Sequence, residues 1–226
     1  MAWLMLDYEP LSPFILRPSN TTSTGGKSLL APTPYAIKMG LLDRLIRHRG
    51  LAEAQAFFPV VRDLTLYLRV PLAASVNRTF QKILRDYKPE SGWVSTIVQI
   101  EFCVFAGVMS LAVPLPDDSA QAELLTQGFC AINYFGRRGG FMQLQGWRTS
   151  DAELSADFVN LCQPNTALLV RGFLQRMDDM EARARFEDVS IFNPKAKGGR
   201  RTYNVVFPYQ LAYHGSNHTV YERMAL

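Results

Sequence analysis

Positively charged side chains gather beside a loop and a helix start where a phosphate could bind. Residues 17–49 read as a polar loop with two glycines, then a Pro-Thr-Pro segment, then apolar residues at helical spacing. Thr33 can cap that helix and Pro34 suits its first turn, so free backbone N–H groups would face an incoming anion. With Lys27 and Lys38 nearby, the stretch predicts a cradle for a nucleic acid or a nucleotide.

A second basic stretch, residues 72–96, mixes cationic and aromatic side chains. The residues of these two kinds are Arg78, Phe80, Lys82, Arg85, Tyr87, Lys88 and Trp93. Lysines and arginines neutralise phosphates, and aromatic rings offer flat surfaces on which bases stack. The stretch therefore predicts a projecting arm that binds nucleic acid. The alternative is a solvated helix with a turn at residues 88–90.

Two glycine-containing turns carry further basic residues. In INYFGRRGGFMQ, Arg137 and Arg138 stand between glycines and directly before a strand. Such glycines let a backbone approach a ligand closely, or simply make a turn. In NPKAKGGRR, lysines and arginines surround a glycine pair, which suits either phosphate contact or an exposed hairpin tip. The acidic residues at 178–181 are expected to form solvated surface.

A nucleotide hydrolase is disfavoured, although Gly26, Lys27 and Ser28 imitate the end of a Walker A loop. That motif needs a glycine where the chain has Thr21, and a helix that starts at the lysine. The two prolines that follow exclude this helix.

The three histidines favour neither metal binding nor catalysis. His214 and His218 have the spacing of a metal-binding pair, but a glycine lies between them and no further ligand is evident. We therefore predict no metal and no cofactor. RNA cleavage needs a base, an acid and charge stabilisation, which His48, Lys38 and Tyr35 could supply. Because His48 lies between two arginines at the helix end, a basic surface cluster is the favoured interpretation.

Length and charge limit the class of protein. The chain has 226 residues, 48% of them hydrophobic, and a net charge of +4. It can bury a large core, and its charge does not by itself require a polyanionic partner. The amino-terminal segment has no positively charged residue before its apolar residues, and it reaches Asp7 after only a few of them. This argues against a signal peptide. No run of apolar residues approaches the length needed to span a membrane. The three cysteines are widely spaced and form no C-x-x-C pair, which fits a protein of the reducing cytoplasm.

The order of the expected elements indicates an α+β fold. Strand patterns cover residues 3–8, 62–70, 97–105, 108–115 and 141–147, and helix patterns cover 35–48, 51–58 and 117–127. With the arm inserted, the series β-α-β-β-α-β predicts a ferredoxin-like domain, in which two helices cover one face of an antiparallel sheet. Beyond it we expect a helix at 150–161, strands at 167–173 and 184–191, and a strand pair at 201–213.

Four segments, taken in order, resemble the Cas-five subunit of CRISPR Cascade complexes, a member of the RAMP superfamily. They are the Arg17-Pro18 loop, the APTPYAIKMGLLD helix start, the VNRTFQKI arm and the INYFGRRGGFMQ turn. The resemblance covers most of residues 1–148 and weakens beyond them. It implies a ferredoxin-like (RRM-like, RAMP) domain at 1–148, with a thumb inserted at about 72–96, and a β-rich C-terminal extension at 149–226 packed on it.

The resemblance also implies a function. In such complexes this subunit holds the 5′ handle of the CRISPR RNA (crRNA) and contacts the large subunit and the adjacent backbone subunit, while the assembled ribonucleoprotein holds target DNA in antiviral defense. Carried onto this chain, the RNA contacts would be Arg17, Ser23, Lys27, Ser28, Thr33, Tyr35, Lys38, Arg78, Phe80, Lys82, Lys88, Arg137 and Arg138. Some members also cut precursor RNA, but their catalytic set does not map onto this chain, so we expect no catalysis.

Two alternatives stay open. One is a metal-independent endoribonuclease of the same superfamily that processes CRISPR repeats, with His48 as its base. The glycine-rich turn at residues 197–200 is a weak point in its favour. The other is a general RNA-binding protein outside CRISPR systems.

Overall fold

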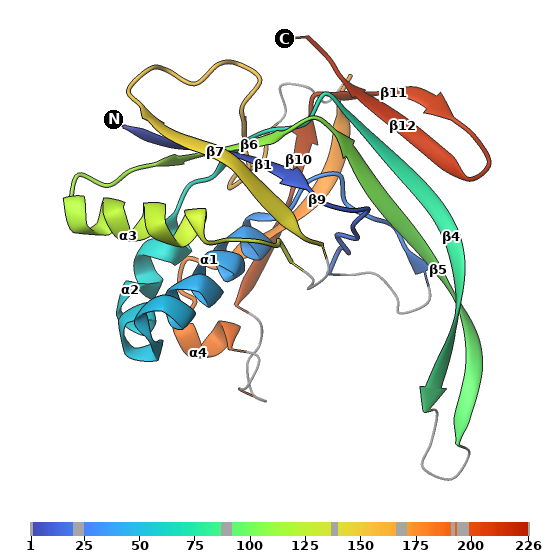
Figure 1. The fold of residues 1–226 in the computed structure, drawn as a ribbon, viewed down its shortest axis with the longest axis horizontal. Helices are drawn as coiled ribbons and strands as arrows, with labels where there is room; N and C mark the ends of the chain where they lie inside the picture. The colour runs from blue at the N-terminus through green and yellow to red at the C-terminus, as the bar shows by residue number, and fades with distance from the viewer. Residues whose placement is uncertain are drawn as a thin grey trace.

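A five-stranded antiparallel sheet forms the centre of the fold (Figure 1). The computed structural model describes residues 2–19, 25–86, 92–136, 140–165, 171–190, 193 and 199–225. The order of strands in the sheet is β7 (Met142–Ser150), β1 (Trp3–Pro10), β6 (Met109–Pro114), β3 (Tyr67–Arg69) and β8 (Val159–Asn160). Each adjacent pair is antiparallel. One side of the sheet carries the helices α1 (Pro34–Arg49), α2 (Leu51–Asp63) and α3 (Ser119–Cys130).

The connections between these elements make the fold ferredoxin-like. Along the chain, β1 leads through α1 and α2 to β3, and β6 leads through α3 to β7. In space these four strands lie in the order β7-β1-β6-β3. This order places the fourth, first, third and second strands of a β-α-β-β-α-β series side by side. The predicted α+β class and ferredoxin-like domain are confirmed.

Alternation along β1 positions the core. Leu4, Leu6 and Tyr8 are fully buried and share one face of the strand. The Tyr8 hydroxyl donates a hydrogen bond of 2.7 Å to the carbonyl of Phe129 in α3, and its ring packs edge to face on Phe135 at 5.1 Å. Burial raises the pKa of Tyr8 above its usual value. The hydroxyl thus stays protonated and links the sheet to α3.

The helix after the predicted cradle has the ends that the sequence suggested. The Thr33 hydroxyl accepts a hydrogen bond from a backbone N–H of the first turn, and Pro34 stands in that turn. Gly50, at φ 88°, ends the helix by donating its N–H to the carbonyl of Ile46. A positive φ favours glycine because it has no Cβ. The helix predicted at residues 35–48 is therefore confirmed as α1.

The next helix is longer than predicted. The sequence placed a short helix before Pro59, but α2 continues through Pro59 to Asp63, so the strand predicted at residues 62–70 is reduced to β3. A proline inside a helix removes one hydrogen bond and costs about 3 kcal/mol. Four apolar side chains that α2 buries offset this cost: Ala54, Phe57, Phe58 and Val61. None of the described helices is long and apolar enough to cross a membrane.

A long hairpin is inserted between β3 and β6 and projects from the body (Figure 1). Its strands, β4 (Ala73–Asp86) and β5 (Trp93–Ala106), each have 14 residues and are paired along their whole length. The predicted inserted arm is present as a β-hairpin, and the alternative, a solvated helix with a turn, is wrong. Residues 97–105, which the sequence assigned to a separate strand, pair with β4 and belong to this arm.

The C-terminal strands join the base of the arm. A second sheet has the order β11 (Tyr209–His214), β12 (His218–Arg223), β4, β5 and β2 (Gly25–Gly26). β12 pairs with the first part of β4, up to Asn77, and β2 pairs in parallel with Gln99 and Ile100 of β5. The loop before α1 and the end of the chain are therefore both built onto the arm.

The last third departs from the prediction at several points. Residues 150–161 form no helix, since they end β7 and include β8. The span 184–190 contains the short helix α4 (Phe186–Val189) in place of a strand, and most of the strand predicted at 167–173 lies outside the described residues. The pair of strands expected at 201–213 is divided between two sheets. Its first strand, β10 (Arg200–Phe207), pairs with β9 (Phe173–Met180), while β11 belongs to the second sheet. Asp178 and Asp179, expected at the surface, are buried in β9.

Candidate nucleic-acid interface

The predicted contact residues of the arm share one face of the hairpin. Side chains alternate along a strand, so those at even positions of β4 point to one side, together with the odd positions of β5 that lie opposite them. We call this surface the arm face, and it consists of Arg78, Phe80, Lys82, Leu84, Asp86, Trp93, Ser95, Ile97, Gln99 and Glu101.

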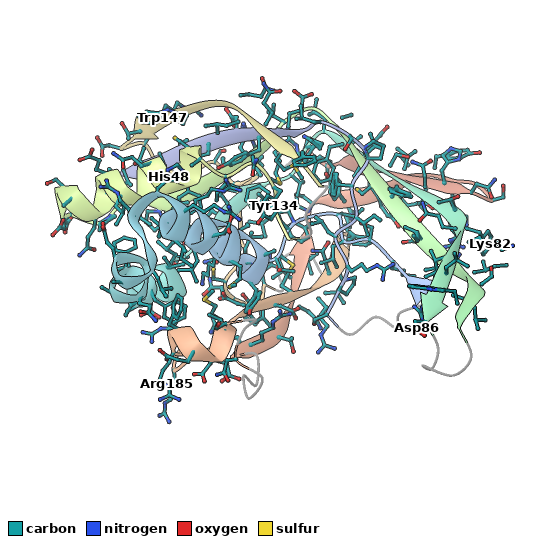
Figure 2. All side chains as sticks on the ribbon, turned by 60° about the horizontal axis from the view of Figure 1, so that its bottom comes forward. His48, Lys82, Asp86, Tyr134, Trp147 and Arg185 are labelled. Carbon is teal, nitrogen blue, oxygen red and sulfur yellow. The ribbon has the colours of Figure 1, made fainter. Side chains whose placement is uncertain are left out.

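The outer half of the arm face is exposed and rich in large apolar side chains. Phe80 is 69% exposed and Trp93 is 71% exposed, while Leu84 and Ile97 are each 65% exposed. Lys82 lies opposite Ile97, and Figure 2 shows it on the projecting part of the hairpin. Exposed rings next to a cation can stack on bases while the cation meets a phosphate.

A buried carboxylate ties the base of the arm to the loop that precedes α1. Glu101 of β5 is 8% exposed. It accepts a hydrogen bond from the backbone N–H of Ser28 at 3.0 Å and forms an ion pair with Arg78 at 3.3 Å. The Ser28 hydroxyl accepts in turn from the N–H of Leu16 at 3.1 Å. These contacts join two stretches that the sequence treated separately, the loop and the arm.

Arg17 lies against this junction with part of its guanidinium unsatisfied. A Cβ on Gly26 would lie 3.3 Å from Arg17 Nε, so the guanidinium rests on the backbone of β2 where glycine leaves room for it. Nε is buried and has no hydrogen-bond partner in the described part of the chain. A buried N–H without an acceptor is costly, and a phosphate oxygen is an acceptor that arginine binds strongly. Lys27, beside Gly26, is exposed.

The C-terminal hairpin adds a surface that the sequence did not suggest. A cavity of about 110 Å³ lies between its turn and the base of the arm, where Arg78 and Glu101 line it. The rings of Tyr213 and His218 stack with their centroids 4.9 Å apart. His214 Nδ1 lies 3.1 Å from a threonine hydroxyl of β12. The two histidines thus have separate partners, and no three metal-binding side chains come together among the described residues.

Four of the predicted contact residues are buried. Their exposed fractions are 8% for Ser28, 8% for Thr33, 8% for Tyr35 and 1% for Lys38. The Arg200 guanidinium covers the Tyr35 ring at 3.8 Å. The Lys38 ammonium donates to the Asp179 carboxylate at 2.7 Å and to a backbone carbonyl of α2 at 2.8 Å. The low exposure of these four side chains favours roles inside the fold over contact with RNA on the arm face.

The other predicted contact residues fall into two groups. Five of them lie on the arm face or at its base: Arg17, Lys27, Arg78, Phe80 and Lys82. Four lie outside the described residues, and their contacts with RNA stay predictions: Ser23, Lys88, Arg137 and Arg138.

The residues considered for RNA cleavage do not meet. Lys38 and His48 both belong to α1, and at 1.5 Å per residue they are about 15 Å apart along its axis. Lys38 is buried against Asp179, whereas His48 is exposed at the other end of the helix. Figure 2 shows His48 well away from the projecting hairpin that carries Lys82. Tyr35, Lys38 and His48 therefore form no catalytic group in this arrangement.

Comparisons with known proteins identify no family for this chain. No family model and no curated protein sequence matches it. Among solved structures it is similar to a CRISPR protein from Archaeoglobus fulgidus, with 9% identity, a TM-score of 0.49, and coverage of 100% of this chain and 93% of that one. It is also similar to a chain in the Type III-B Cmr-beta complex bound to cognate target RNA, with 10% identity, a TM-score of 0.42, and coverage of 66% of this chain and 60% of that one. Both TM-scores lie below 0.5, so neither likeness establishes a relationship.

Proposed function

We propose that this protein is an RNA-binding subunit of a CRISPR effector complex, and that the arm face and the junction at its base hold the crRNA. The observation that carries this proposal is the arm itself, where exposed Phe80 lies beside Lys82 on one face of a projecting hairpin and exposed Trp93 lies farther out on the same face. At its base lies the half-buried guanidinium of Arg17, whose Nε has no hydrogen-bond partner among the described residues. The four sequence segments that resemble the Cas-five family support the assignment to CRISPR systems.

Within such a complex we propose the role that the resemblance implies, in a type I Cascade. The subunit would cap the 5′ handle of the crRNA and contact the adjacent backbone subunit and the large subunit, in a complex that holds target DNA in the cytoplasm. Arg17, Lys27 and Arg78 would meet handle phosphates at the base of the arm. The outer half of the arm face would separate two bases of the RNA. The protein would bind RNA without cutting it.

The chemistry of these groups suits tight capture. Stacking of a base on an aromatic ring contributes about 1–3 kcal/mol, and Phe80 and Trp93 are both open to such contact. Each phosphate that a cation neutralises adds an attraction that salt weakens. The Arg78 side chain is 48% exposed despite its pairing with Glu101, so it can still reach a phosphate. Several modest contacts on one surface thus add up to firm binding.

Titration of labelled CRISPR repeat RNA with the purified protein tests the proposal. Both retention and integrity of the RNA are measured. We expect the RNA to be retained uncut, and Phe80→Ala to weaken binding by about fivefold or more, the lower end of one lost stacking contact. Lys82→Ala should also weaken it. Arg183→Ala removes the same charge from the turn after β9, beyond the arm, and should leave affinity unchanged.

Two outcomes would decide against this proposal. Retention that neither Phe80→Ala nor Lys82→Ala affects would show that RNA does not use the arm face. Cleavage that His48→Ala abolishes would favour the repeat-processing endoribonuclease in place of a binding subunit.

A further inference from the structure

A polar cavity of about 200 Å³ lies between the end of α2, the turn after β8 and the strands β9 and β10. It shares no residue with the arm face. Three cationic side chains line it, from three different elements: Lys38, Arg62 and Arg201. A water molecule takes up about 30 Å³ in the liquid, so the cavity has room for a tetrahedral oxyanion together with some waters.

The charges around this cavity do not cancel. Asp179 is fully buried and forms ion pairs with both Lys38, at 2.7 Å, and Arg201, at 2.9 Å. One carboxylate therefore faces two cations. Arg62 and Asp63, 2.7 Å apart, form a second pair that is neutral as a unit. These five side chains together carry one excess positive charge.

Other groups near the cavity stay uncharged at neutral pH. Burial raises the pKa of the Cys162 thiol to about 11, and burial also raises the pKa of the Tyr203 hydroxyl, which lies 3.4 Å from the Asp179 carboxylate. Neither group supplies a negative charge. The other polar side chains of the wall are neutral and can donate hydrogen bonds; they are Thr65, Asn160 and Gln163.

We propose that this cavity binds a phosphate-class oxyanion, either inorganic phosphate or the terminal phosphate group of a nucleotide or an RNA. Such an anion supplies the negative charge that the cluster lacks. The attraction is stronger here than on an open surface, because Lys38 and Asp179 lie in a region of low effective dielectric constant. Arg201, with its side chain 48% exposed, reaches the mouth of the cavity. The cavity has room for a phosphate group, and the rest of a larger ligand can project outward.

Calorimetric titration of the full chain with inorganic phosphate tests the proposal. We expect saturable binding, and an unfolding temperature that rises with phosphate concentration. Gln163 is an exposed residue of the cavity wall, so Gln163→Glu adds a carboxylate there with little change of shape. The affinity of this variant for phosphate should be lower than that of the wild type by about tenfold or more. Gln143→Glu makes the same exchange at an exposed position of β7 and should bind like the wild type.

A second set of titrations separates the sources of the phosphate. Two RNA oligonucleotides of one sequence are compared, one with a terminal phosphate and one with hydroxyl ends. Tighter binding of the phosphorylated RNA that Gln163→Glu abolishes identifies an RNA end as the ligand. Displacement of phosphate by nucleoside monophosphates alone identifies a small molecule.

The absence of saturable phosphate binding would overturn the proposal, and so would equal binding by Gln163→Glu and the wild type. The RNA with hydroxyl ends reports on the arm face alone. Failure of the anion site is therefore distinguishable from failure of the proposed RNA-binding function.

Discussion

Lys38 and Asp179 form a buried ion pair that fixes α1 against β9. Their side chains are 2% and 0% exposed, and the charged atoms are 2.7 Å apart. Arg201 approaches the other carboxylate oxygen of Asp179 at 2.9 Å. Removing one partner from a buried pair typically costs 3–5 kcal/mol, because the other charge is left without compensation. The arrangement is asymmetric. Asp179 has two cationic partners, whereas Lys38 forms an ion pair with one carboxylate among the described residues.

This asymmetry predicts an order of stabilities. Asp179→Asn leaves the Lys38 ammonium buried without a counter-charge and should lower the free energy of unfolding by about 3–5 kcal/mol. Lys38→Met keeps Asp179 paired with Arg201 and should cost less. Urea unfolding measures both. Lys27→Met, at an exposed position, should change stability by less than about 0.5 kcal/mol. Equal costs for the two buried substitutions would show that Arg201 does not compensate Asp179.

Among the secondary-structure elements, the arm is the one that can be shortened without opening the core. Lys82 and Ile97 lie opposite each other in β4 and β5, so an Asn-Gly turn in place of residues 83–96 would close a shorter hairpin. The contacts of Glu101 with Ser28 and Arg78 lie nearer the base and stay intact. The shortened chain should therefore keep its fold.

We expect the shortened protein to unfold at nearly the same temperature as the full chain but to bind repeat RNA more weakly, because it lacks Trp93 and Leu84. Calorimetry and the RNA titration measure the two properties. A fall in unfolding temperature of 10 °C or more, which corresponds to at least about 2.5–5 kcal/mol for a chain of this size, would show that the outer arm supports the core. Unchanged RNA affinity would show that the part of the arm beyond Lys82 and Ile97 does not bind RNA.

The sequence predicted local elements better than their partners. The ends of α1 follow from Thr33 and Gly50 alone, and the mixed basic and aromatic stretch correctly indicated an inserted arm. The second strand of the arm was misassigned because its base is buried on both faces, as Ile100 and Cys103 show, and such a strand reads like one in a core sheet. Lys38 was assigned to RNA because its partner, Asp179, lies 141 residues away. Spacing along the chain carries no information on that contact.

For the molecule as a whole, buried hydroxyl and thiol groups predict a loss of stability in alkali. Burial raises the pKa of such groups above the usual 10.0 for tyrosine and 9.0 for cysteine, and it does so most strongly for five of them: Tyr8, Tyr203, Tyr209, Cys103 and Cys162. The unfolded chain releases these protons first as the pH rises. Above about pH 9 the folded state thus holds more protons than the unfolded state, and the free energy of unfolding falls with rising pH.

Urea unfolding at a series of pH values measures this effect. We expect these five groups to contribute a constant amount to the free energy of unfolding between pH 7 and pH 8. From about pH 9 upward their contribution should fall steadily. The Tyr8→Phe variant removes one contributor, so its stability should fall less steeply. A free energy of unfolding that is the same at pH 7 and at pH 11 would contradict the burial of these groups.

The salt dependence of RNA binding distinguishes phosphate neutralisation by cations from base stacking on aromatic rings at the proposed interface. For single strands, the logarithm of the binding constant falls against the logarithm of salt concentration with a slope of about 0.7 for each neutralised phosphate. Lys27→Gln should therefore reduce the slope by roughly 0.7. Phe80→Leu should lower affinity at every salt concentration and leave the slope unchanged, because stacking displaces no counterions. Arg183→Gln should change neither quantity. If Phe80→Leu reduced the slope as Lys27→Gln does, Phe80 would act by positioning the cations and not by stacking on a base.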